Sequence, residues 1–114
     1  MKMYLESKKI YLSNQAIDFR KSINGLCAAV IEQLEEEPGE GLYIFYNKRR
    51  NKLKILSRHI NGFILIYKKL DKGTFFIEAS EEKIKINRQQ LDWLLLGTDW
   101  KLLGANQKKF SNYF

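Results

Sequence analysis

The chain has 114 residues, 45% of them hydrophobic and 13% aromatic, and its formal net charge at pH 7 is +7. This length and apolar content predict one folded domain, residues 1–114, with a single modest core, and they exclude the disordered class. No apolar run approaches the roughly 20 residues of a membrane helix, and the single cysteine fits a reducing cytoplasm, so we expect a cytoplasmic protein without a membrane partner.

A short strand and a long helix are expected first. Residues 8–13, KKIYLS, alternate polar and apolar side chains, which is typical of a strand with one buried face. We predict a helix over about residues 18–35, with Asp18 near its start as the residue that caps the first-turn amides. Apolar residues recur at helical spacing and predict one buried helix face: Phe19, Ile23, Leu26, Val30 and Leu34.

The remainder of the chain is rich in strand patterns. Residues 42–46, LYIFY, are apolar throughout, as in a strand covered on both faces. Residues 52–56, KLKIL, alternate in character, which predicts that Lys52 and Lys54 face solvent. Further strands are expected at residues 62–70, 74–79 and 83–87, and a second helix at residues 88–96.

The predicted order of elements is β-α-β-β-β-β-β-α, with tight turns between the later strands. It indicates an α+β fold, in which a mainly antiparallel β-sheet of four to six strands is packed by two helices. Parallel βαβ units would contradict this prediction. Residues 103–114 show no clear period and are expected to form a flexible tail or to dock through Phe110 and Phe114.

The basic excess lies in the middle of the chain. Residues 41–72 carry nine lysines and arginines against Asp71 alone, whereas residues 1–40 carry five against seven acids and residues 73–114 carry six against five. Such segregation points to a polyanionic partner, with nucleic acid ahead of an anionic membrane surface. The candidate nucleic-acid-binding residues are Lys48, Arg49, Arg50, Lys52, Lys54, Arg58, Lys68 and Lys69.

Paired strands would gather these cations on one side of the sheet and at one rim. A two-stranded ribbon fits the DNA major groove, where turn arginines reach base edges and lysines hold phosphates, so we favour DNA over RNA as the partner. On a single strand, Tyr43, Tyr46 and Tyr67 would stack on unpaired bases. The side chains expected to lie closest to the nucleic-acid backbone are Arg49, Arg50 and Arg58.

Four segments occur in a characteristic order: DFRKSINGLCAAV, LYIFYNKRRNKLKIL, GFILIYKKLDKGTF and INRQQLDWLLLGTDW. Together they resemble the TnpB accessory protein, the product of the second reading frame, of insertion sequence family sixty-six. The matching motif positions are Asp18, Arg20, Lys21, residues 45–50, Gly62, Phe63, residues 68–71, Gly73 and residues 90–100. The resemblance covers about residues 8–102 and implies a cytoplasmic protein that supports transposition beside a separate transposase.

One stretch departs from the family's pattern. Residues 56–63 read LSRHINGF, so that Ser57, Arg58 and His59 stand where family members have aromatic and acidic residues. This exchange makes the hairpin more basic. The resemblance implies no particular molecular activity, and the chemistry must therefore be inferred from the residues themselves.

No catalytic constellation is evident. His59 is the only histidine and has no cysteine or second histidine with which to share a metal. The candidate carboxylates for a metal-dependent reaction, Asp18, Asp71, Asp92 and Asp99, fall on separate predicted elements. Neither a glycine-rich phosphate loop nor a Gly-x-Ser-x-Gly motif is present. We therefore expect no enzymatic activity, no cofactor and no bound metal.

Two other interpretations compete with nucleic-acid binding. Lysines on a strand also protect an exposed edge from aggregation, and turn arginines are often merely solvated. The chain could instead act as an adaptor that docks on the element's transposase, or on a partner accessory protein, through Trp93 and Trp100. Exposed tryptophan side chains would support the adaptor hypothesis, and burial against the sheet would not.

Overall fold

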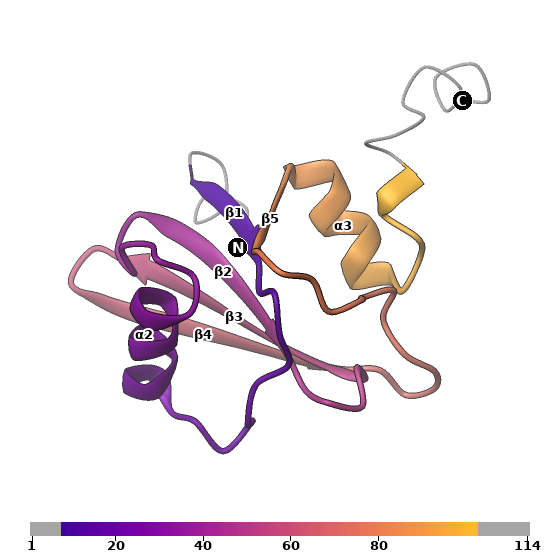
Figure 1. Cartoon of the computed structure of the whole chain (residues 1–114), viewed down its shortest axis with the longest axis horizontal. Coiled ribbons are helices and arrows are strands. Elements are labelled where there is room, and N and C mark those ends of the chain that lie inside the picture. The colour runs from indigo at the N-terminus through magenta and orange to yellow at the C-terminus, as the bar shows by residue number, and fades with distance from the viewer. Residues whose placement is uncertain (1–7, 103–114) are drawn as a thin grey trace.

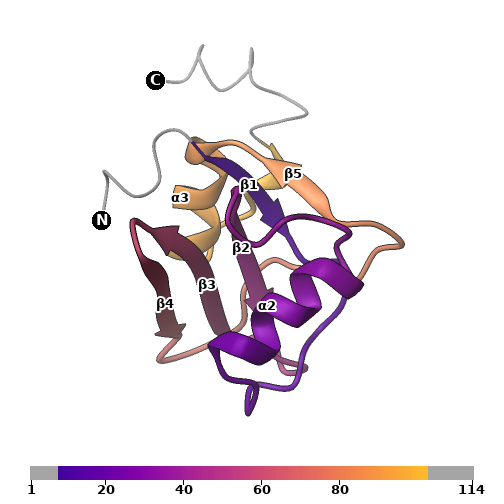
Figure 2. The ribbon, with the colours of Figure 1, turned by 90° about the vertical axis from the view of Figure 1, so that its left-hand side faces the viewer.

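The computed structural model describes residues 8–102, which form one five-stranded sheet with a helix on each face (Figure 1). The strands lie in the order β4–β3–β2–β1–β5, and the turned view in Figure 2 shows α2 and α3 on opposite sides of the sheet. Along the chain the elements are β1 (Lys9–Leu12), α2 (Ile23–Glu32), β2 (Gly41–Tyr46), β3 (Lys52–His59), β4 (Gly62–Lys69), β5 (Ile84–Ile86) and α3 (Arg88–Leu96).

The sheet is mainly antiparallel, which confirms the predicted α+β fold class. β2, β3 and β4 form an antiparallel meander, and β5 is antiparallel to β1. The prediction that parallel βαβ units are absent is wrong, because β1 is parallel to β2 and α2 connects them as a βαβ unit. A parallel pair requires a long crossover, and the helical segment between these two strands supplies it.

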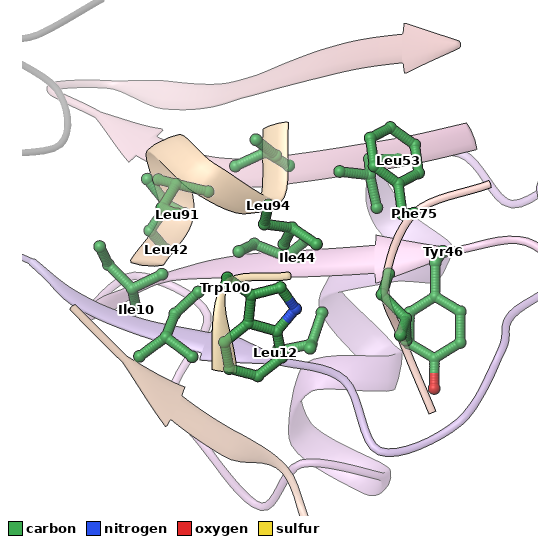
Figure 3. Packing of buried hydrophobic residues seen from close by; sticks show 13 residues of the cluster. Ile10, Leu12, Leu42, Ile44, Tyr46, Leu53, Phe75, Leu91, Leu94 and Trp100 are labelled. Carbon is green, nitrogen blue, oxygen red and sulfur yellow. The ribbon is translucent and has the colours of Figure 1, made fainter. Parts of the chain in front are cut away.

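β2 is the central strand, and all six of its residues are buried, as its apolar sequence predicts. Its side chains enter two cores in alternation, because neighbours in a strand point to opposite faces. The core on the α3 side, drawn in Figure 3, includes Leu42, Ile44, Tyr46, Leu91, Leu94 and Trp100. The core on the α2 side includes Leu26, Val30, Leu34, Tyr43 and Phe45. Since both faces of β2 are covered, a large ligand cannot reach the centre of the sheet.

The helix predicted over residues 18–35 is shorter in the structure, where α2 begins after Ser22. Asp18 is not its cap, which corrects the sequence prediction. The Asp18 Oδ1 accepts the Arg20 backbone N–H at 2.9 Å, and the carboxylate pairs with the Arg20 guanidinium at 2.6 Å. This turn occupies the carboxylate, and the helix starts later, with the Leu26 N–H donating to the Ser22 carbonyl at 2.9 Å. The predicted apolar face still packs on the sheet.

Residues 74–79 do not form the predicted strand but cross the α3 face of the sheet. Phe75 and Ile77 are buried while Phe76 is 48% exposed, so burial alternates along this segment although it pairs with no strand. The backbone groups find partners outside a ladder. The Phe75 N–H donates to the Arg50 carbonyl at 2.7 Å, and the Phe76 carbonyl accepts from the Trp100 indole N–H at 2.7 Å.

Helix α3 begins and ends where the sequence predicts. The Asn87 side chain accepts the Gln90 backbone N–H at 2.8 Å and the Gln90 side chain accepts the Asn87 N–H at 2.9 Å, which closes a capping box. Gly97 ends the helix with a left-handed φ of 80°. No helix among residues 8–102 is long and apolar enough to cross a membrane. The tail predicted at residues 103–114 lies outside the described residues.

Candidate nucleic-acid interface

The turn between β2 and β3 is built around the side chain of Asn47. Its Oδ1 accepts the backbone N–H groups of Asn51 and Lys52, each at 3.0 Å, and its amide donates to the Asn51 side chain at 2.7 Å. The Arg50 N–H closes the turn on the Asn47 carbonyl at 2.9 Å. An asparagine that bonds to nearby backbone in this way fixes a turn that its neighbours alone would leave loose.

The same turn is tied to the chain that follows β4. The Arg50 carbonyl accepts from Phe75 at 2.7 Å, and the Asn51 carbonyl accepts from the Leu70 N–H at 2.9 Å. Arg50 has a φ of 60°, a left-handed conformation that is unfavourable for a residue with a side chain. The surrounding hydrogen bonds hold it there, so the turn presents its side chains from a constrained backbone.

These contacts bring a set of cations to one end of the sheet. Four of them, Lys48, Arg49, Lys69 and Lys72, are exposed, and Arg50 and Lys52 are half-buried. Within residues 8–102, no carboxylate makes an ion pair with any of the six. We call this set the basic end: Lys48, Arg49, Arg50, Lys52, Lys69 and Lys72.

Lys72 belongs to the basic end although it is not among the eight candidates from the sequence. It lies in the bend after β4, between the Leu70 and Phe75 amides that bond to the β2–β3 turn. The sequence carried a signal for it, since Lys72 falls in the Asp-Lys-Gly turn at the end of the basic segment. The sequence could not show that the chain on both sides of this bend is hydrogen-bonded to the β2–β3 turn.

Lys54 and Lys68 have intramolecular partners, which corrects the expectation that Lys54 faces solvent. Lys54 is 8% exposed, and its Nζ donates to the carbonyls of Phe19 at 2.7 Å and Lys21 at 3.2 Å. The ammonium also lies 4.9 Å from the centre of the Phe19 ring. The Lys68 Nζ donates to the Leu95 carbonyl at 2.6 Å. Both lysines connect segments outside the strands to the sheet through these hydrogen bonds. Their ammonium groups are therefore poorly placed to hold phosphates.

Arg58 lies at the opposite end of β3 from the turn. Six residues separate it from Lys52, which corresponds to about 20 Å along a strand. Its guanidinium stacks 5.1 Å from the centre of the Phe63 ring, and it lines a shallow hollow together with Glu37 and Glu40. The structure therefore does not bring Arg58 together with Arg49 and Arg50.

Of the three tyrosines considered for base stacking, only Tyr67 has a usable surface. Tyr43 and Tyr46 are fully buried, and the Tyr43 hydroxyl donates to the Glu37 carbonyl at 2.7 Å. Burial raises the pKa of Tyr46, and the nearby Arg50 charge opposes that rise. Tyr67 is 52% exposed and contacts the Phe19 ring edge-on, with the ring centres 6.0 Å apart. It is the cross-strand neighbour of Lys54, one position before Lys68.

The tryptophans of the adaptor hypothesis are not a free surface. Trp100 is 4% exposed in the α3-side core, and its indole N–H donates to a backbone carbonyl. Trp93 is half-buried and packs against the same core. Burial of Trp100 does not support docking through this side chain.

The acidic candidates remain apart, as their separate elements predict. Asp18 pairs with Arg20, whose hydrogen bonds hold the pKa of the carboxyl at about 2, and Asp92 pairs with Arg88 on α3. Within residues 8–102, no three histidine, cysteine or acidic side chains are grouped closely enough to hold a metal ion. The basic end is therefore the arrangement of this surface with the clearest chemical meaning, which is attraction of a polyanion.

Comparison with known proteins gives a consistent result. A family model described as IS66 Orf2 like protein matches residues 8–105. An uncharacterized Sinorhizobium fredii protein, y4jC, is 31% identical over 94 residues, which cover 81% of this chain and 80% of that protein. A second uncharacterized protein of the same organism, y4hO, is 30% identical over 98 residues, which cover 84% and 85% of the two chains. No solved structure matches the chain.

Proposed function

The chain belongs to the family of IS66 Orf2-like proteins, and we propose that it supports transposition of its insertion sequence by binding nucleic acid with the basic end of its sheet. Proteins of this family are accessory proteins of such elements. Transposition takes place on the element's DNA, so a surface that attracts phosphates suits this setting. The proposed role is to hold nucleic acid rather than to cut or join it.

The observation that carries this proposal is a cluster of cations on and beside a constrained turn, none of which makes an ion pair with a carboxylate among residues 8–102. Exposed lysines and arginines on folded proteins commonly have carboxylates nearby, and four such ion pairs occur elsewhere among residues 8–102. The basic end contains none of them. Six cations stand there against Asp71 in the same bend, so positive charge predominates and would attract a polyanion.

The shape of the site favours a nucleic-acid backbone as the ligand. The β2–β3 turn presents Lys48 and Arg49 at the end of the sheet, where both side chains are exposed and can reach phosphates. Lys52 and Lys69 lie side by side behind the turn, where they can hold phosphates on one flank. Contacts of this kind position a protein on DNA and carry little sequence information by themselves.

The experiment is a binding titration of the purified chain against a labelled duplex that contains the element's terminal repeat. The same titration with scrambled duplex, single-stranded DNA and RNA of equal length identifies the preferred partner. Three to five phosphate contacts predict that log affinity falls with log salt at a slope of roughly −3 to −4.5 on duplex DNA. If none of these ligands binds at low salt, the proposal is wrong and the adaptor hypothesis takes its place.

A further inference from the structure

The strand at the outer edge of the sheet has an open side. β4 pairs with β3 along its whole length, from Gly62 to Lys69, and no other strand among residues 8–102 pairs with it (Figure 2). Every second residue of such an edge directs its N–H and C=O groups away from the sheet. The opposite edge, β5, has only three residues and offers far less backbone.

The centre of β4 lacks the features by which proteins usually protect an edge, and its two lysines lie at one end. Its centre reads Phe-Ile-Leu-Ile-Tyr from Phe63 to Tyr67, without a proline, a glycine or a charge. Its register with β3 is continuous, so no bulge twists it away. The four residues before Tyr67 are only partly buried, and Ile64 belongs to neither core. A strand of this kind is completed by another strand.

We propose that β4 pairs antiparallel with β4 of a second copy of this chain, centred on Leu65, so that two sheets join as one. In this register Leu65 faces Leu65 of the copy, Ile64 faces Ile66, and Phe63 faces Tyr67. Aromatic pairs and pairs of β-branched side chains directly opposite each other are the favourable combinations in antiparallel sheets. The contact uses the same strand on both copies, as a twofold dimer requires.

The distribution of charge selects this partner and this register. The cations of β4 lie at one end, at Lys68 and Lys69, and the antiparallel arrangement sends the two pairs to opposite ends of the joint. Lys68 then faces Gly62 of the copy, where no side chain opposes it. Moving the centre two residues toward Tyr67 would set Lys68 against Ile66 and Lys69 against Leu65, which removes the apolar pairs. In the register centred on Leu65, all five residues from Phe63 to Tyr67 face one another, so the strand is complementary to itself.

The first test measures the mass of the intact chain by sedimentation over a range of concentrations up to millimolar. We expect a dimer that dissociates on dilution, and Ile64→Lys should shift the equilibrium at least tenfold toward monomer, because it places two charges in the centre of the joint. Leu96→Lys is the matched control, since Leu96 is 72% exposed on α3, and it should leave the equilibrium unchanged. Circular dichroism establishes that both variants are folded.

The second test fixes the register without relying on a disruptive change. In a Cys27→Ala background, Leu65→Cys should form a disulfide-linked dimer on mild oxidation, because directly opposed residues of antiparallel strands have Cα atoms about 5.5 Å apart. Leu96→Cys in the same background should not. If the chain stays monomeric at all concentrations, the proposal is wrong. The partner of the β4 edge would then be an extended segment of another protein. A dimer that resists Ile64→Lys and gives no Leu65→Cys crosslink also overturns it.

Discussion

Lys52 and Lys69 lie directly opposite each other in the β3–β4 ladder, two cations on one face of the sheet. Their side chains are neighbours, since Cβ atoms of opposed residues are about 4.5–5.5 Å apart, and like charges in this position destabilise a sheet. No carboxylate among residues 8–102 pairs with either of them. A surface that served only solubility would not require this arrangement, whereas a surface that binds phosphates gains from it.

Replacement of Lys69 by threonine should therefore have opposite effects on folding and on binding. The free energy of unfolding should rise by about 0.2–1 kcal/mol, because the like-charge contact is lost and threonine suits a strand. Affinity for duplex DNA should fall, and the salt slope should flatten by about 0.9. Urea unfolding and salt titration measure the two effects. The matched control is Lys85→Thr on β5, because Lys85 faces Tyr11 and not another cation. This control should neither raise the free energy of unfolding nor flatten the salt slope in the same way.

The turn cations should contribute most of the attraction for phosphate. The double change Lys48→Gln and Arg49→Gln removes two exposed charges from the basic end, and the salt slope should flatten by about 1.8. Its control removes the same charge elsewhere, through Lys9→Gln and Lys85→Gln at the β1–β5 side of the sheet. Equal effects of the two double variants would show that net charge, and not the basic end, governs binding.

Lys54 should behave as a structural residue. Lys54→Met removes the ammonium that donates to the Phe19 and Lys21 carbonyls and should lower the free energy of unfolding by about 1–3 kcal/mol. The salt slope should stay at the wild-type value, because this ammonium does not reach a phosphate. The change is measured by urea unfolding and by titration of the folded variant. A slope that flattened by about 0.9 would instead place Lys54 among the phosphate contacts.

The Cys27 thiol should react slowly in the folded protein. Burial raises its pKa, and the charge of Arg58 partly opposes this shift. The thiolate is the reactive form, so iodoacetamide should alkylate the folded protein more slowly than the urea-unfolded chain. The alkylation rate of the folded protein should rise only at higher pH. Because the folded pKa is the higher one, the group's stabilising contribution is present below the unfolded pKa and is lost as pH rises through the folded pKa. Arg58→Gln should slow alkylation further, because it removes the charge that lowers the pKa of Cys27. A faster reaction would contradict this role of Arg58.

Sequence patterns predicted what depends on periodicity. The buried face of α2, the doubly covered β2 and the ends of α3 follow from apolar spacing and capping residues, and the structure confirms them. The same patterns failed where a contact distant in sequence decides the outcome. Residues 74–79 are apolar because they lie on a core, and only the Arg50 and Trp100 contacts reveal that they are not a strand.

The candidate site shows the same division. The sequence located the basic segment, but it could not separate lysines that face solvent from one that is buried. Lys54 alternates like its neighbours, and its role depends on the carbonyl of Phe19, which lies far away in the sequence. Arg58 belongs to the same segment and yet lies at the other end of β3. Charge counts locate a basic segment, and the register of the strands decides which of its members act together.

The constrained turn provides the most specific test of the proposed interface. Asn47→Ala removes the acceptor for the Asn51 and Lys52 amides and should lower the free energy of unfolding by about 1–3 kcal/mol. It changes no charge. A looser turn must be ordered on binding, so affinity for duplex DNA should fall several-fold while the salt slope stays at the wild-type value. Loss of slope together with affinity would mean that phosphate contacts themselves had been lost.

Asn87→Ala is the matched control, because it removes the same kind of bond at a distance from the basic end. The Asn87 side chain caps α3 by accepting the Gln90 amide, and its loss should destabilise the fold by about 0.5–2 kcal/mol. Under conditions in which both variants are fully folded, the affinity of Asn87→Ala for DNA should equal that of the wild type. If Asn87→Ala weakens binding as much as Asn47→Ala, general loosening explains both losses. If Asn47→Ala binds as tightly as the wild type, the constrained turn does not contribute to binding.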